Sequence, residues 1–290
     1  PGDTLPPAVS PSAPGADDTL PYARRAGIPP GYPASYAATV RAAEDEGQLV
    51  IYSTTDALVV APLLADFQTL YPRIRVTYED LGSTVLYHRF VAETQLGSES
   101  ADVLWSSAMD QQAALVSAGY AMSYDSPEKS SLPAWAHWKD EAFATTYEPV
   151  VIAYNKDLLP AADVPQTHAD LARLLGADPA RFRNKVVTYD IGKSGLGFFL
   201  ATQDAAAGPE FWNIAKALGQ AETRLELTTG AMVEQLISGR SLIGYNLLGA
   251  YTITQASKHP SLGYVLPRDY TLVMSRILIA NKEADHPNAA

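Results

Sequence analysis

The stretch Gly47-Gln48-Leu49-Val50-Ile51-Tyr52-Ser53-Thr54-Thr55-Asp56 decides the fold class of this chain. Its apolar residues predict a short buried strand, and the strand runs directly into a cluster of hydroxyl side chains. A helical pattern and a second strand at 74–78 follow closely. Strands that alternate with helices over short connections are typical of a mostly parallel sheet with helices on both faces. Ligands bind to such sheets where strands end and helices begin, so the hydroxyl cluster is a candidate site.

The same order of elements recurs along the rest of the chain. Apolar residues at helical spacing predict a helix after most of the strands. No internal repeat is evident, so we interpret the recurrence as an α/β fold rather than a repeat array. Further strands are predicted at 102–105, 149–155, 185–190, 241–246 and 270–280.

The composition is that of a globular protein and excludes several kinds of site. The chain has 290 residues, of which 47% are hydrophobic and 18% charged, enough for one large or two medium domains. A net charge of −11 argues against non-specific nucleic-acid binding, which needs clustered Lys and Arg. Because the chain has no cysteine, disulfides, thiolate zinc sites and cysteine nucleophiles are excluded.

The first 33 residues are rich in proline and are predicted to form an arm or tether. A disordered tail without a role is the alternative interpretation. Because the chain begins at Pro1 rather than at Met, we expect a processed N-terminus, from which a signal peptide would already have been removed.

Small hydroxyl residues follow the predicted strands or open the helices after them. The N–H groups at a helix N-terminus lack partners and carry partial positive charge, so they attract anions without Lys or Arg. Each hydroxyl could instead serve only as a helix cap. Their recurrence at equivalent strand ends favours one shared ligand site. The candidate residues are Ser53 and Thr54, Ser83 and Thr84, Ser106 and Ser107, and Ser194 with Gly195.

Three further candidates lie beside these hydroxyls. Lys193 could add positive charge, and Tyr245 and Asn246 stand at the end of the strand predicted at 241–246. The amide of Asn246 offers a ligand both a donor and an acceptor, or it caps the next helix. Although Gly192, Lys193 and Ser194 suggest a P-loop, its first glycine would fall on Val187, so we predict no nucleoside triphosphate site.

No enzyme motif is found. The chain has neither G-x-S-x-G around Ser194 nor H-E-x-x-H, and its histidines lack metal-ligand spacing. We therefore predict no catalytic residue, no metal and no cofactor.

Five groups of residues together resemble one protein family. They are 36–56; Phe67, Tyr71-Pro72 and Ile74-Arg75-Val76; Ala101-Asp102-Val103-Leu104-Trp105; Val150 and Tyr154-Asn155-Lys156; and Gly239 with Ile243-Gly244-Tyr245-Asn246. The pattern resembles the type 2 periplasmic solute-binding proteins of ABC importers, in the branch of iron(III) and phosphate-ester carriers. The resemblance covers about residues 36–290.

The resemblance implies a two-lobed α/β fold with two crossover strands and a ligand cleft between the lobes. Lobe one would comprise 34–148 and 269–290, and lobe two 149–268, after an arm at 1–33. The crossovers would lie near 147–153 and 271–280. Because members of the family continue for several more helices, we expect the last helices of lobe one to be missing from this sequence.

The resemblance also bears on the ligand. Iron-binding members place adjacent tyrosines just after the strand that here ends at Asn246, where this chain has Leu247 and Leu248. A ferric ion needs anionic oxygen ligands, so we predict no iron site there. Carriers of sugar phosphates, phosphoglycerate or phosphonates are a better match. By resemblance, Ser194 and Gly195 would hold an anionic group from lobe two, and Ser83 and Thr84 from lobe one.

We therefore predict a solute-binding component of an ABC importer that is periplasmic or, as the alternative, extracytoplasmic and tethered to the membrane. It would bind a small organic anion (a phosphate ester, phosphonate or carboxylate) by lobe closure and deliver it to an inner-membrane permease, as a monomer without catalysis. The alternatives are the ligand-sensing input domain of a membrane receptor, a ferric-iron carrier with a non-standard site and, least favoured, a hydrolase of the same anions.

Overall fold

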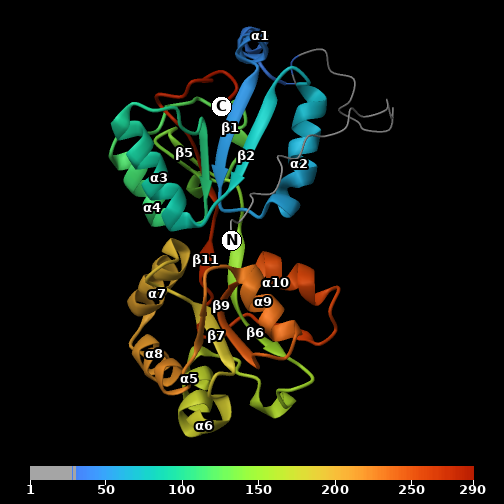
Figure 1. Cartoon of the computed structure of the whole chain (residues 1–290), viewed down its shortest axis with the longest axis vertical. Coiled ribbons are helices and arrows are strands. Elements are labelled where there is room, and N and C mark those ends of the chain that lie inside the picture. Colours follow the sequence, from blue (N-terminus) through green and yellow to red (C-terminus); the bar gives the residue numbers. More distant parts are fainter. Residues whose placement is uncertain (1–27, 29–30) are drawn as a thin grey trace, which may run out of the picture.

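The computed structural model describes residue 28 and residues 31–290, and it contains two α/β lobes (Figure 1). Each lobe is built on its own six-stranded sheet, with strand order β2-β1-β3-β12-β5-β4 in lobe one and β10-β6-β9-β7-β8, plus β11 beside β6, in lobe two. The predicted two-lobed α/β fold is therefore confirmed. Most of the predicted arm at 1–33 lies outside the described residues.

Lobe one is a parallel sheet that is extended by antiparallel strands. β1 runs parallel to both β2 and β3, whereas β12 returns antiparallel beside β3. Figure 1 shows α2 on one side of this sheet and α3 and α4 on the other. The elements are α1 (Tyr36–Glu46), β1 (Gln48–Ser53), α2 (Ala57–Leu70), β2 (Arg75–Asp80), α3 (Ser83–Leu96), β3 (Val103–Ser106), α4 (Met109–Ser117), β4 (His137–Trp138), β5 (Ala142–Ala144) and β12 (Ile277–Ala280).

Lobe two combines parallel and antiparallel pairing. β7 runs parallel to β8 and β9, and β6 lies antiparallel to β9 and β10. The elements are β6 (Glu148–Asn155), α5 (His168–Ala177), α6 (Pro179–Phe182), β7 (Val186–Tyr189), α7 (Gly195–Ala207), α8 (Glu210–Gln220), β8 (Arg224–Glu226), α9 (Thr229–Ile237), β9 (Ile243–Leu248), α10 (Gly249–Ala256), β10 (Leu262–Val265) and β11 (Val273–Met274).

The chain passes between the lobes twice, and the two crossings run side by side. The first leads from β5 into β6 and the second from β11 into β12, and these strands pair antiparallel with each other. Between the strand pairs, Thr145 N donates to Arg276 O (2.9 Å) and Ser275 Oγ donates to Thr146 O. The predicted pair of crossover strands is present, and its hydrogen bonds tie the two crossings into one hinge.

The predicted strands differ from the observed ones by one to three residues at their ends, and in two of them the difference bears on the site. The strand predicted at 241–246 runs from Ile243 to Leu248, because Leu247 and Leu248 are also buried in the core of lobe two. Asn246, which has a φ of 62°, therefore lies inside β9 rather than at its end. The strand predicted at 270–280 is divided into β11 and β12, because Ser275 and Arg276 turn into the hinge between them.

Gly249 sets how closely α10 packs against the crossover strand β6. A Cβ atom on Gly249 would lie 2.6 Å from the backbone oxygen of Pro149, which the hinge holds in place. We expect Gly249→Ala to lower the free energy of unfolding by about 1–3 kcal/mol in urea denaturation, because α10 must move away. The matched control is Gly176→Ala in α5, where a Cβ meets no atom within 4 Å. Equal stability of the two variants would contradict this account.

Candidate functional site

The candidate site is a pocket between the two lobes, with a volume of about 80 Å³. Both lobes and the hinge contribute to its wall, as expected for a ligand cleft at the carboxyl ends of strands. A larger hollow of about 190 Å³ lies within lobe one, but no Asp, Glu, Lys or Arg side chain lines it. The interlobe pocket is lined by Thr54, Asp56, Asp80, Leu81, Gly82, Ser83, Ser107, Tyr189, Ser194, Leu196, Leu227, Thr228, Thr229, Gly230, Leu248, Tyr251 and Arg276.

Thr54 and Ser107 are brought together because β1 and β3 are neighbouring parallel strands. Thr54 Oγ1 accepts from Ser107 N (2.9 Å) and donates to Ser107 Oγ (3.1 Å). The preceding residues of each pair, Ser53 and Ser106, point the other way and are fully buried. Their hydroxyls accept from the backbone two residues further on and only shape the turns. Side-chain alternation along a strand therefore divides each pair into one pocket residue and one turn residue.

Ser83 and Ser194 meet across the cleft, at the N-termini of α3 and α7. Ser83 Oγ accepts from Leu196 N of the opposite lobe at 3.2 Å, and Ser194 Oγ caps α7 by accepting from Gly197 N at 3.1 Å. A Cβ on Gly195 would lie 2.6 Å from Gln111 Nε2 and 3.0 Å from Ser83 Oγ. A Cβ at this position would have to displace the end of the Gln111 side chain, so glycine at 195 favours the close approach of the two helix ends.

Besides Ser53, Ser106 and Gly195, four sequence candidates do not line the pocket. Thr84 lies on α3 beside Ser83 but outside the lining. The Lys193 side chain is 75% exposed and pairs with Asp190 at 3.6 Å. Tyr245 Oη and Asn246 Nδ2 both donate to Asp204 Oδ2 at 2.7 Å, inside lobe two. Their place at the pocket is taken by Leu248, two residues further along β9.

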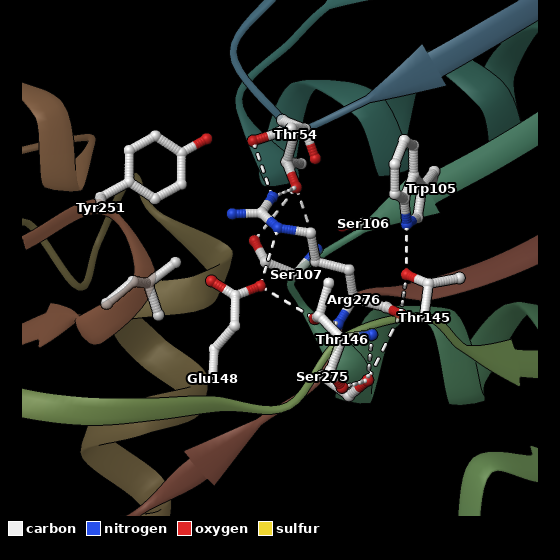
Figure 2. A network of polar contacts seen from close by, with 12 residues as sticks. Thr54, Trp105, Ser106, Ser107, Thr145, Thr146, Glu148, Tyr251, Ser275 and Arg276 are labelled. Carbon is white, nitrogen blue, oxygen red and sulfur yellow. Dashed lines mark hydrogen bonds and ion pairs between the residues drawn. The ribbon is translucent and has the colours of Figure 1, made fainter. Parts of the chain in front are cut away.

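Arg276, which the sequence analysis did not identify, is the cation of the pocket. It lies in the hinge and is only 4% exposed. Its Nε donates to Glu148 Oε1 at 3.0 Å and its Nη1 to Thr54 O at 3.1 Å, and the guanidinium lies 5.6 Å from the ring centroid of Tyr251 (Figure 2). An arginine inside the mostly apolar segment 272–280 was the available signal, since a buried charge requires partners.

The pocket combines helix N-termini with two carboxylates. The first residues or caps of α2, α3, α7 and α9 all lie in its wall, and each helix end contributes partial positive charge. Asp80 Oδ2 accepts from Ala57 N at 3.1 Å, so this carboxylate is already bound to the start of α2. Burial raises the pKa of the Asp80 carboxyl above its ordinary value.

Tyr251 of α10 makes a second direct contact between the lobes. Its hydroxyl oxygen accepts from Asp56 N at 3.2 Å, which leaves the hydroxyl proton free to be donated. Burial raises the pKa of Tyr251, so the hydroxyl stays protonated at neutral pH. The pocket therefore offers neutral hydroxyl donors, main-chain N–H groups and one guanidinium to a ligand.

Within the part of the chain that the structure describes, no group of three or more His, Asp or Glu side chains is placed to hold a metal ion. No helix in that part is long and apolar enough to cross a membrane.

Two lobes, a pair of crossover strands and a polar pocket between the lobes define the class of two-lobed periplasmic binding proteins. Residues 62–290 match the sequence profile described as bacterial extracellular solute-binding protein, and the chain belongs to this family. No curated protein sequence matches it.

Solved structures agree with this assignment. The substrate-binding protein of an ABC transporter from Agrobacterium tumefaciens is 39% identical, with a TM-score of 0.80 over 83% of this chain and 71% of that chain. AfuA from Actinobacillus pleuropneumoniae, solved with fructose-6-phosphate bound, is 18% identical, with a TM-score of 0.68 over 84% of this chain and 76% of that chain. Iron-bound HitA from Pseudomonas aeruginosa is 19% identical, with a TM-score of 0.67 over 83% of this chain and 78% of that chain. The last two show the fold alone.

The predicted family and the extracytoplasmic location are therefore confirmed: the chain is an extracellular solute-binding component of an ABC transporter. Proteins of this kind bind a small ligand and work with a membrane permease.

Proposed function

We propose that this protein binds a small organic anion (a phosphate ester, phosphonate or carboxylate) between its lobes and delivers it to an inner-membrane ABC permease. It acts as a monomer, without a cofactor, catalysis or nucleic-acid binding. The observation that carries the proposal is Arg276, a buried guanidinium at the floor of a pocket whose wall contains several helix N-termini.

The donor geometry supports an anionic ligand. Ser107 Oγ accepts from Thr54, which leaves its proton free, and the Tyr251 hydroxyl is likewise free to donate. Helix N-termini stabilise an anion by up to about 2 kcal/mol where they are partly buried. Two carboxylates in the pocket wall, Asp56 and Asp80, would repel an anionic ligand. Both lie near the start of α2, whose partial positive charge offsets part of their repulsion of an anion.

The contacts across the cleft support lobe closure. The bonds Leu196 N to Ser83 Oγ and Asp56 N to Tyr251 Oη hold the lobes together, and the paired crossings permit a hinge motion. A ligand that contacts both lobes favours this closed state over an open one. The permease would recognise the closed state.

The test is a thermal-shift screen of the protein against phosphate esters, phosphonates, carboxylates, sugars and ferric citrate. A ligand that binds only the folded state raises the melting temperature, and we expect an anion class to do so without product formation. Stabilisation by ferric iron alone, or turnover of the ligand, would contradict the proposal.

For the anion found in that screen, we expect the double variant Ser83→Ala, Ser194→Ala to bind more than tenfold more weakly by calorimetry, a loss of at least about 1.4 kcal/mol. Both hydroxyls lie where the two helix ends meet, and Ser83 also bonds across the cleft. Ser117→Ala, at the exposed end of α4, is the control and should bind as the wild type does. A smaller loss in the double variant would place the ligand elsewhere.

A further inference from the structure

Glu148 has one carboxylate oxygen without a partner at the floor of the cleft. The residue is 4% exposed and lies at the start of β6, in the hinge. Its Oε1 accepts from Thr146 Oγ1 at 2.9 Å and from Arg276 Nε at 3.0 Å. Its Oε2 is buried and, among the described residues, accepts no hydrogen bond. Buried carboxylate oxygens are nearly always bonded, so Oε2 requires a donor from elsewhere.

Arg276 presents a matching free donor. Its hydrogen bonds within the described part of the chain use Nε and Nη1, which leaves both N–H bonds of Nη2 available. Figure 2 shows Nη2 and the free oxygen of Glu148 on the same side of the ion pair, turned toward Tyr251. The hinge therefore offers a donor and an acceptor side by side.

This donor–acceptor pair lies next to the pocket. Tyr189 and Tyr251 both line the pocket, and the negative charge of Glu148 acts on both of their hydroxyls. Arg276 itself belongs to the pocket wall. Glu148 is not itself a lining residue, and its hydrogen bond with Arg276 places it directly behind the pocket wall.

We propose that Glu148 accepts a hydrogen bond from an O–H or N–H group of the solute, while Arg276 and the helix N-termini bind the anionic group of the same solute. The substrate class is therefore small organic anions that carry a hydroxyl or ammonium donor close to the anionic group. This inference rests on the proposed function, and it excludes simple anions without such a donor as good ligands.

A ligand that lacks the O–H or N–H donor would leave the Oε2 atom of Glu148 without a hydrogen bond. A site built to bond a ligand hydroxyl or amine rejects the analogue that lacks it, because a buried polar group is then left unpaired. For Glu148 the unpaired atom would be a carboxylate oxygen, which makes the discrimination stronger than for a neutral acceptor.

The experiment measures dissociation constants by calorimetry for pairs of probes that differ mainly in the donor. Glycerol 3-phosphate is compared with propyl phosphate, glycerate with propionate, and 2-aminoethylphosphonate with ethylphosphonate. In at least one pair, we expect the wild type to bind the donor-bearing member at least tenfold more tightly. The first two pairs test a hydroxyl, and the third tests an ammonium group.

The variant Glu148→Gln reverses the polarity of the free position if its amide oxygen stays on Arg276. We expect the tenfold preference to fall to threefold or less, through weaker binding of the donor-bearing member, whereas the other member binds as well as before or better. Glu99→Gln, at an exposed position, is the matched control and should keep the preference.

Each outcome is decisive. If both members of every pair bind the wild type equally well, a water molecule rather than the solute satisfies Glu148, and this inference is wrong while the proposed function stands. If none of the six probes binds, this inference is wrong, and the thermal-shift screen decides the proposed function. The wild-type comparison decides the question even if Glu148→Gln fails to fold.

Discussion

Replacing Arg276 by methionine is expected to weaken anion binding at least 100-fold, about 2.8 kcal/mol, and to lower the melting temperature. Affinity falls because the cleft loses its buried guanidinium. Stability falls because Glu148, also buried, then lacks its charged partner (3.0 Å). Breaking a buried ion pair by removing one partner costs about 3–5 kcal/mol. Calorimetry and urea denaturation measure the two effects separately.

A double variant separates the loss of binding from the loss of stability. Arg276→Met with Glu148→Leu removes both charges, and replacing a whole buried pair by apolar side chains is often neutral for stability. We expect the double variant to recover most of the lost stability but none of the affinity. Arg240→Gln, at an exposed position, is the control. Wild-type affinity in the folded Arg276→Met variant would show that the anion does not bind at Arg276.

Replacing Asp204 by alanine is expected to lower the free energy of unfolding by about 3–5 kcal/mol. Asp204 on α7 is fully buried and accepts from Tyr245 Oη, Asn246 Nδ2 and Tyr270 Oη at 2.7, 2.7 and 3.0 Å. The variant leaves these three donors without their acceptor inside lobe two. It also releases Asn246, whose left-handed backbone lies inside β9. Urea denaturation followed by tryptophan fluorescence measures the loss.

Asp204→Asn is the matched control, because it keeps the volume and one acceptor oxygen. We expect this variant to lose less than half as much stability as Asp204→Ala. Hydrogen exchange should show faster exchange in β9 of the alanine variant than in the strands of lobe one. A loss below about 1 kcal/mol for Asp204→Ala would mean that water replaces the carboxylate without cost.

Local pattern predicted the fold well, because strand–helix alternation is a local property of the sequence. The hydroxyl residues Thr54, Ser83, Ser107 and Ser194, which line the pocket, could be predicted because strand ends and helix starts are recognisable in the sequence. Ser53 and Ser106 could have been set aside on side-chain alternation alone. The prediction used only their position at a strand end, and that position does not separate them from the pocket residues Thr54 and Ser107.

The rest of the site depends on contacts between distant segments. Arg276 meets Glu148 and Thr54 only because the second crossing runs beside the first, and no local pattern encodes that pairing. Tyr245 and Asn246 looked accessible because the strand was predicted to end at Asn246. Two more buried leucines extend β9, and Asp204, 42 residues earlier in sequence than Asn246, holds both side chains inside lobe two.

The two bonds that bridge the lobes differ in their tolerance of mutation at their two ends. In one bond Asp56 N donates to the Tyr251 hydroxyl, and in the other Leu196 N donates to the Ser83 hydroxyl. In both bonds, therefore, the donor is a main-chain N–H and the acceptor is a side-chain hydroxyl. Every amino acid except proline supplies that N–H. Evolution can therefore vary positions 56 and 196 to change the shape of the pocket while closure is retained. Drift at Ser83 or Tyr251 would loosen the closed form, whatever the solute.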